Sequence, residues 1–293
     1  MLIWKLPRRL ASQAASVLFM VGVWFTLPSL ASSGAPHEWG VDMIVGASPI
    51  RSKMDHFHDV YLVPMMFGVS IFVLGLLLYV LVRFNRRANP EPKKFTHNAL
   101  IEILWTAAPV IILMIIAIPS MDLLYYADKV DKPDLTVKVT GHQWYWSYEY
   151  PDHGNFGFDS RPIWESSSVT EQKAAELLKE AEPNWLTPTP KPLRLLETDR
   201  RLVVPVGANI RVLIAGVDVI HSWYVPALGV QKAAMPGRLN ETWMKADRAG
   251  VFYGQCTQIC GIGHGYMPIV VEAVAPDRFE AWIKEQKAAS NAQ

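Results

Sequence analysis

The stretch Gln255 to Val271, QCTQICGIGHGYMPIVV, contains the only two cysteines of the chain, Cys256 and Cys260. His264 follows at Cys-x-x-x-His spacing, and Met267 follows at His-x-x-Met spacing. Thiolate, imidazole and thioether groups are soft ligands, a set suited to copper. The two cysteines could instead form a disulfide, but a disulfide would not need a histidine and a methionine beside it. The stretch therefore predicts a metal centre with redox chemistry.

A second histidine, His221, lies upstream in VDVIHSWYVP, after a predicted strand over Asn209–Ala215. In a Greek-key sandwich, a residue at that place can reach a loop between later strands. A single copper ion needs one thiolate, two imidazoles and a weak axial Met. Two thiolates with two imidazoles suit a pair of copper ions bridged by both sulfurs, with Met267 and a backbone carbonyl as weak ligands.

Short runs of β-forming residues separated by turn signals begin at Leu135. They predict an all-β Greek-key sandwich or barrel over residues 126–275, with a surface insertion over 160–192 that holds an acidic helix at Val169–Ala181. A final helix and tail are expected over 276–293. The predicted strands are Leu135–Val139, Trp144–Tyr150, Arg201–Val206, Asn209–Ala215, Val251–Gln255 and Pro268–Val274.

Two apolar runs, residues 60–82 and 101–125, are each long enough to span a bilayer and predict a transmembrane hairpin over 60–125. The loop between them is basic, which places it in the cytoplasm. Residues 1–33 read as a secretory signal peptide, with a retained first membrane helix as the alternative. Residues 34–59 are then a polar periplasmic segment. We expect a multi-pass protein of the bacterial inner membrane with both mature termini in the periplasm.

Composition narrows the function further. The 293-residue chain is 51% hydrophobic with a formal net charge of +1, which excludes a strongly basic nucleic-acid-binding protein. Neither apolar run has a histidine or cysteine in its interior, and the chain has no Cys-x-x-Cys-His motif. The chain therefore cannot ligate haem by the usual residues, so any haem chemistry belongs to a partner.

Four segments resemble cytochrome c oxidase subunit II, and the resemblance spans most of residues 55–285. The segments are IHSWYVP (220–226), MPGRLNETW (235–243), GHQWYWSYEYP (141–151) and GQCTQICGIGHGYMPIVVEAV (254–274). The resemblance implies a cupredoxin-like domain with a dinuclear copper A centre. By the same resemblance, electrons pass from cytochrome c through this centre to haem in subunit I, where oxygen is reduced to water with proton pumping; subunit III is a further partner.

Ligand roles follow from the resemblance residue by residue. It implies that Cys256 and Cys260 bridge the copper ions, that His221 and His264 are terminal ligands, and that Met267 is a weak ligand. It also implies that the backbone carbonyl of residue 258 is a ligand of the copper ion that Met267 does not bind. The family usually has Glu at 258, whose carboxylate also reaches a magnesium ion at the boundary with subunit I. Gln258 keeps an oxygen but loses the charge, so we expect a weakened or rearranged magnesium site.

Three further residues are candidates for function. Alternation along a strand predicts that Trp144 and Trp146 share one face and Tyr145 takes the other. Aromatic clusters are more often core, but the resemblance makes Trp144 the exposed point where electrons enter, with Tyr145 beside it. Glu102 begins the second apolar run, and is either an interfacial carboxylate that snorkels or, as the resemblance implies, the mouth of a proton path into subunit I.

Other functions stay open at this point. A related reductase, such as a nitric-oxide reductase with a similar copper subunit, and a membrane-tethered copper chaperone are the alternatives. Four carboxylates near the proposed point of electron uptake could form an acidic collar for a basic cytochrome c or could be an ordinary polar surface. They are Glu149, Asp152, Asp159 and Asp218.

Overall fold

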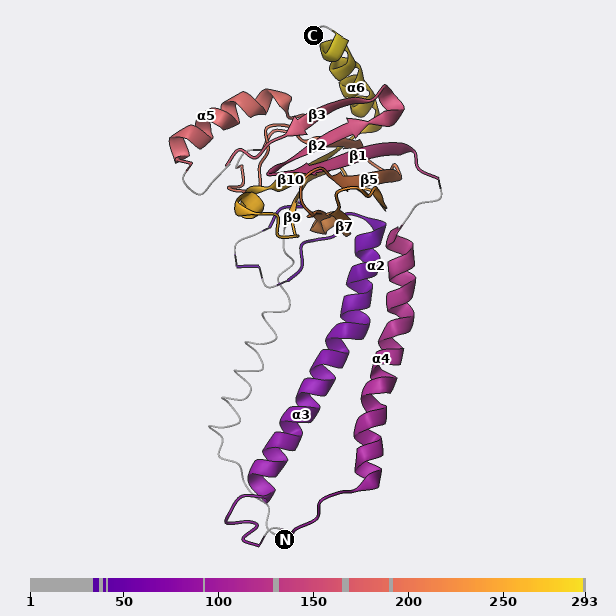
Figure 1. Ribbon diagram of the computed structural model, residues 1–293, viewed down its shortest axis with the longest axis vertical. Helices are drawn as coiled ribbons and strands as arrows, with labels where there is room; N and C mark the ends of the chain where they lie inside the picture. Colours follow the sequence, from indigo (N-terminus) through magenta and orange to yellow (C-terminus); the bar gives the residue numbers. More distant parts are fainter. Residues whose placement is uncertain are drawn as a thin grey trace, which may run out of the picture. The chain divides into compact units, whose positions relative to one another are not determined.

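The computed structural model describes residues 34–36, 39–40, 42–91, 93–128, 132–164, 169–189 and 192–291. The predicted signal peptide, residues 1–33, lies outside the described residues. The described chain consists of membrane-length helices followed by a β-sandwich and a C-terminal helix (Figure 1).

The β-sandwich confirms the predicted fold class. It has two five-stranded sheets, in the orders β3-β2-β1-β5-β8 and β4-β10-β9-β6-β7. The pairs β1–β5 and β4–β10 are parallel, and the remaining neighbours are antiparallel. The strands are β1 (Leu135–His142), β2 (Tyr145–Tyr150), β3 (Phe156–Ser160), β4 (Leu202–Pro205), β5 (Ile210–Gly216), β6 (His221–Val225), β7 (Val230–Ala234), β8 (Asn240–Met244), β9 (Gly250–Cys256) and β10 (Pro268–Val274).

The core lies between the sheets and follows from side-chain alternation. In β1, Leu135, Val137 and Val139 are buried while the residues between them are half-buried. Helix α6 (Pro276–Asn291) closes one end of this core, where the Trp282 ring meets the Tyr150 ring edge-on at 5.4 Å. The predicted C-terminal helix is therefore present, with its aromatic face buried.

Four of the ten strands in the described part of the chain lack a counterpart among the predicted ones: β3, β6, β7 and β8. Strand β6 is buried at four of its five positions because it lies between β9 and β7 and is covered on both faces. A strand covered on both faces has no period-two pattern, so alternation could not reveal it.

The two predicted membrane segments are helical and longer than expected. The first is continuous through α2 (Pro49–Phe57), a π-helical turn η1 (His58–Leu62) and α3 (Val63–Arg83), and the second is α4 (Ala99–Asp128). Both are long and apolar enough to cross a membrane. The first helix begins at Pro49, before the span predicted from residue 60, and Ser48 caps it by accepting from the Arg51 amide at 2.9 Å.

Hydrogen bonds join the ends of these helices to the sandwich. The Ala47 amide donates to the Ala227 carbonyl at 2.8 Å. From the other side, the Trp243 indole donates to the Tyr126 carbonyl at 2.8 Å and Thr242 donates to the Ala127 carbonyl at 3.1 Å. The Ala47 amide and the Tyr126 and Ala127 carbonyls therefore find their hydrogen-bond partners in the sandwich.

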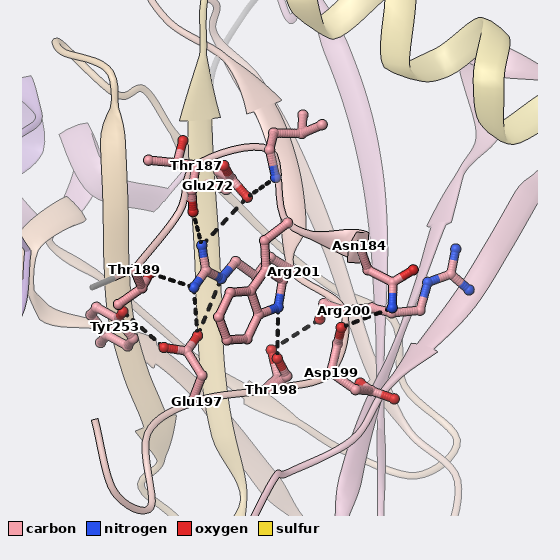
Figure 2. Close-up of polar contacts among 12 residues, drawn as sticks. Asn184, Thr187, Thr189, Glu197, Thr198, Asp199, Arg200, Arg201, Tyr253 and Glu272 are labelled. Atoms are coloured by element: carbon pink, nitrogen blue, oxygen red, sulfur yellow. Dashed lines mark hydrogen bonds and ion pairs between the residues drawn. The ribbon is translucent and has the colours of Figure 1, made fainter. Parts of the chain in front are cut away.

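The insertion forms its own small core around α5 (Glu171–Ala181). The bounds of α5 are close to those predicted for the acidic helix, Val169–Ala181. Its return segment is held by Arg201, whose side chain is fully buried (Figure 2). Arg201 donates to the Thr187 carbonyl at 2.9 Å, to Thr189 Oγ1 at 2.6 Å, and to Glu197 Oε1 at 2.9 and 3.2 Å. Its guanidinium also lies 3.7 Å from Glu272 of β10. These hydrogen bonds and ion pairs connect the return segment of the insertion to the sheet that contains β10.

Candidate metal centre

The cysteine loop is the connection of an antiparallel hairpin. Cys256 ends β9, β10 begins at Pro268, and the Cys256 amide donates to the Met267 carbonyl at 3.0 Å. Gly261 has a φ of 117°, a backbone conformation that favours glycine, and it turns the chain into the short helix η5 (Ile262–Tyr266). The hairpin therefore returns the ligands after Cys260 toward Cys256.

His221 reaches the same place from a neighbouring strand. Strand β6 pairs with β9, and Trp223 lies opposite Cys256 in that pairing. Ligand atoms of His221, Cys256 and Cys260 lie within 4.8 Å of one another, and all three residues are buried. The structure thus brings His221 to two cysteines that follow it by more than thirty positions in the chain.

The remaining predicted ligands surround this cluster. The Cys256 and Cys260 sulfurs are 3.8 Å apart, and His264 Nδ1 lies 3.6 Å from the Cys260 sulfur. The Gln258 carbonyl oxygen is 3.3 Å from the Cys256 sulfur, while the Gln258 side chain is at the exposed surface. Met267 is fully buried in the same core cluster as both cysteines. All six predicted metal ligands therefore belong to one loop-and-strand region.

The His221 ring is oriented by Asp218. His221 Nε2 lies 2.7 Å from Asp218 Oδ1, and the same carboxylate accepts from the amides of Val219 and Gln143 at 2.7 Å each. Nδ1 is buried and has no hydrogen-bond partner within the described part of the chain. Metal-ligating histidines typically have this arrangement, in which a carboxylate orients the ring through one nitrogen and the other nitrogen is available to bind the metal.

The two thiols differ in electrostatics. Burial opposes the Cys256 thiolate, but the nearby His221 ring and backbone groups of Ser222 and Gln258 outweigh it and lower the pKa of Cys256 to about 6. Burial and the neighbouring Cys256 charge raise the pKa of Cys260 to about 12. The pair therefore loses one proton readily, whereas loss of the second proton needs a nearby cation, which a bound metal would supply.

These observations test whether the residues fit copper. A disulfide would need an S–S distance of about 2.05 Å, well below the 3.8 Å between these free thiols. The donors are two thiols, two imidazoles, a thioether and a carbonyl, a set of soft and borderline ligands. His221 Nδ1, which has no hydrogen-bond partner among the described residues, would gain a partner if it bound a metal ion. The site therefore fits copper ions.

Trp144 covers the cysteine loop from outside. Its indole Nε1 donates to the Cys260 carbonyl at 3.1 Å, and a side chain at Gly263 would collide with its ring. Trp144 is half-buried and precedes β2, so the predicted shared face with Trp146 is wrong: Trp146 is fully buried and meets the His221 ring edge-on at 5.8 Å. Alternation applies only from Tyr145 onward, where the strand begins.

Glu102 lies in the first turn of α4 and takes part in its capping. The Asn98 amide donates to Glu102 Oε1 at 3.0 Å, and Asn98 Oδ1 accepts from the Ile101 amide at 3.2 Å. Such reciprocal bonds satisfy amides that have no partner inside the helix. The carboxylate therefore has a structural role in addition to the predicted alternatives.

Comparison with known proteins decides the family. Residues 135–274 match the periplasmic domain of cytochrome c oxidase subunit II, and residues 36–123 match its transmembrane domain. The chain belongs to the cytochrome c oxidase subunit II family. It is 42% identical over 279 residues to the probable cytochrome c oxidase subunit 2 of Rickettsia bellii, covering 95% of this chain and 96% of that one. It is 37% identical to the subunit 2 of Cereibacter sphaeroides, covering 94% and 90%.

A solved structure is also similar. It is the periplasmic domain of subunit II of cytochrome oxidase from Bradyrhizobium japonicum, 43% identical, covering 55% of this chain and 99% of that one with a TM-score of 0.45.

Membership of the cytochrome c oxidase subunit II family settles the general function. The chain is a membrane-anchored subunit of a haem-copper oxidase complex, with a periplasmic cupredoxin domain that binds copper and serves respiratory electron transport. Of the three functions considered from sequence, this match supports the oxidase subunit over the nitric-oxide reductase subunit and the copper chaperone.

Two positioning residues were missed as such by sequence reasoning. Asp218 appeared only as a surface carboxylate, and Gln143 did not appear at all, yet Gln143 donates to Asp218 from its amide and to the Cys260 carbonyl from its side chain at 2.8 Å. The Asp-x-x-His spacing before β6 was the available signal for Asp218. Gln143 gave no such signal, because its two partners are distant in sequence.

Proposed function

We propose that this chain holds a dinuclear copper A centre that accepts electrons from cytochrome c at Trp144 and passes them to haem in subunit I. Cys256, Cys260, His221 and His264 would hold the two ions, with both thiolates shared between them. Met267 and the Gln258 carbonyl would be the weak ligands. The observation that carries the proposal is the 3.8 Å approach of two free, buried thiols beside a histidine nitrogen that has no hydrogen-bond partner among the described residues.

When bound, a pair of copper ions would supply one-electron exchange at the two thiolates. The protein contributes a rigid frame for this exchange. Asp218 fixes the His221 ring, and the β9–β10 hairpin fixes the cysteines. Trp144 connects the surface to the Cys260 carbonyl through a single hydrogen bond of 3.1 Å. Electrons that reach the indole are therefore one contact away from the ligand loop.

Substitution of one bridging cysteine tests the two-copper assignment. Cys256→Ser should abolish the delocalised two-copper EPR signal and the near-infrared absorption of the purified oxidase. Gln258→Ala is the matched control, because it removes the side chain two positions away and keeps the backbone carbonyl. It should retain both signals. A Cys256→Ser oxidase with an unchanged two-copper spectrum would refute the proposal.

The magnesium site is proposed to be weakened because Gln258 lacks the carboxylate that Mg²⁺ favours. Gln258→Glu should then raise the magnesium content of the purified complex and leave the copper spectrum unchanged. Equal, tightly held stoichiometric magnesium in both forms would contradict this.

Glu102 is proposed to lie at the mouth of a proton path into subunit I. Glu102→Gln separates this role from capping, since an amide oxygen can still accept from the Asn98 amide but the group cannot carry a proton. The variant should lower turnover while copper content and thermal stability stay unchanged. Full turnover would leave only the capping role.

A further inference from the structure

We infer that the periplasmic end of the membrane hairpin binds a phospholipid whose zwitterionic headgroup carries a primary ammonium. The site is a pocket between α2 and α4 in which Lys53 binds the phosphate and Asp122 binds the ammonium. The inference goes beyond the proposed function and rests on it only for the direction in which the pocket faces.

The pocket lies between the two helices of the hairpin and has a volume of about 400 Å³. Its lining combines charged side chains with aromatic and apolar ones, as a lipid headgroup and the first part of its chains require. Lys53, His56 and Phe57 come from α2, Tyr61 from the π-helical turn η1, and Asp122 and Leu123 from α4.

Two contacts between α2 and α4 position the charges of the pocket. Lys53 Nζ lies 3.3 Å from Asp122 Oδ2 and 4.0 Å from the centre of the Tyr126 ring. The ion pair is long and open to the outside, since the Lys53 side chain is 45% exposed and the Asp122 side chain 76% exposed. Exposed pairs of this kind are weak, so each group can exchange its partner for a headgroup charge.

A neighbouring cation and carboxylate complement a headgroup in which a phosphate and an ammonium are joined by a short linker. The Lys53 ammonium donates to phosphate oxygens and the Asp122 carboxylate accepts from the headgroup ammonium, both as charge-assisted hydrogen bonds. A phosphoglycerol headgroup has no cation for Asp122. A choline headgroup has the cation but no N–H that could donate to the carboxylate. The charges of the pocket therefore favour phosphoethanolamine.

Helix geometry places the pocket at the level of the lipid headgroups. Glu102 lies in the first turn of α4, and Asp122 follows it by 20 residues. At about 1.5 Å per residue this is roughly 30 Å, the thickness of the hydrocarbon core of a bilayer. With Glu102 at the cytoplasmic boundary of the membrane, Asp122 is therefore at the periplasmic boundary.

The pocket faces away from the side of α4 that carries Glu102. The interval from Glu102 to Asp122 is about five and a half helical turns, so the two carboxylates lie on nearly opposite sides of the helix. In the proposed function, Glu102 faces the proton path into subunit I. The Asp122 side of α4 is then turned toward the lipid.

An apolar hollow of about 520 Å³ continues from the pocket into the membrane span. Its lining is mainly apolar and includes Leu62, Met66 and Ile116. Leu62 directly follows Tyr61 of the pocket, and Ile116 lies about one turn of α4 before Pro119, which also lines the pocket. A lipid held by its headgroup in the pocket can therefore extend an acyl chain along this hollow.

Photochemical labelling of the intact oxidase complex in vesicles tests the inference. The vesicles consist of phosphatidylcholine with a trace of one of three photoreactive lipids, whose chains are identical and whose headgroups are phosphoethanolamine, phosphoglycerol or phosphocholine. Peptide mass spectrometry measures the labelling of residues 54–62 and 116–126. The ethanolamine probe should label these segments about five- to tenfold more than either other probe, as expected for one additional charge-assisted hydrogen bond.

Substitutions assign the two charges to the two parts of the headgroup. Asp122→Asn should lower labelling by the ethanolamine probe about five- to tenfold and bring it to the level of the phosphoglycerol probe. Lys53→Gln should lower labelling by all three probes, since each carries the phosphate. Asp128→Asn is the matched control, because it removes from the end of the same helix a carboxylate that lies 2.9 Å from Lys232. It should leave the labelling unchanged, and all three variants should keep the copper spectrum.

Equal labelling by the three probes, or unchanged labelling of Asp122→Asn, would overturn the inference. Labelling of the middle of α3 without labelling of the pocket segments would overturn it too, because another protein surface then covers the pocket. Turnover of Glu102→Gln tests the proton path separately. If that variant has full turnover while the pocket is labelled as expected, the lipid site stands and the proposed proton path fails.

Discussion

The copper-ligand loop and the Arg201 network are both buried polar clusters, but they differ in how completely their groups are paired. In the network, all three Arg201 nitrogens have partners, and Tyr253 donates to the second Glu197 oxygen at 3.0 Å (Figure 2). Within the described residues, Glu272 Oε1 is the one buried side-chain atom of the network without a hydrogen bond. In the loop, His221 Nδ1 has no partner among the described residues, and two thiols face each other without bonding. A cluster that is paired at all but one atom stabilises the fold, whereas an incomplete set of soft donors in a rigid frame is available to bind a metal.

The largest expected effect comes from breaking the paired cluster. Arg201→Ala leaves Glu197 and Glu272 buried without their cation, so the free energy of unfolding should fall by about 3–5 kcal/mol. Arg211→Ala is the control, because it removes an exposed ion pair with Glu241 and should cost at most about 1 kcal/mol. Chemical denaturation measures both. If the two variants lose equal stability, the network is not the main fastening of the insertion.

An intermediate effect, on copper affinity, is expected from substitution of Asp218, which bonds to His221 in the copper-ligand loop. Asp218→Asn should lower copper affinity about 10- to 100-fold, because the His221 ring loses the carboxylate that orients it. Competition with a copper chelator measures this, and the position of the near-infrared band reports whether His221 has moved. Asp152→Asn, which also removes a carboxylate bonded to a backbone amide, is the control and should leave affinity unchanged. Unchanged affinity in both would show that the β6 backbone alone positions the ring.

The smallest effect on stability should come from substitution of Trp144, which lies over the cysteine loop. Its substitution should mainly change the rate of electron transfer. Trp144→Ala should slow reduction by cytochrome c about tenfold and leave the copper spectrum intact, since the ring contacts the loop but no ligand atom. Trp144→Phe keeps an aromatic ring and loses only the bond to the Cys260 carbonyl, which is about 0.5–1.5 kcal/mol, so its slowing should be smaller. Stopped-flow kinetics at fixed donor concentration separates the two, and unchanged rates for both would exclude Trp144 from the electron route.

Much of this architecture could be predicted because it depends on local pattern. The membrane helices follow from length and apolarity, and six strands follow from alternation or β-forming runs. The α2 helix at Pro49 was missed because its contacts are with the sandwich, through Ser48 and Leu228, rather than within a periodic apolar run. Strand β6 was missed because burial on both faces removes the alternation that marks a strand.

Most of the donor set of the copper site can be read from one short stretch, since Cys256, Cys260, His264 and Met267 fit within one hairpin loop and ligand chemistry depends on residue type. The fold decided how His221 joins them, because the pairing of β6 with β9 is a long-range contact. It also decided that Trp144 lies on the loop while Trp146 lies in the core, and that two of the surface carboxylates, Glu149 and Asp159, are paired. Side-chain partners across strands depend on register, which no single stretch of sequence contains.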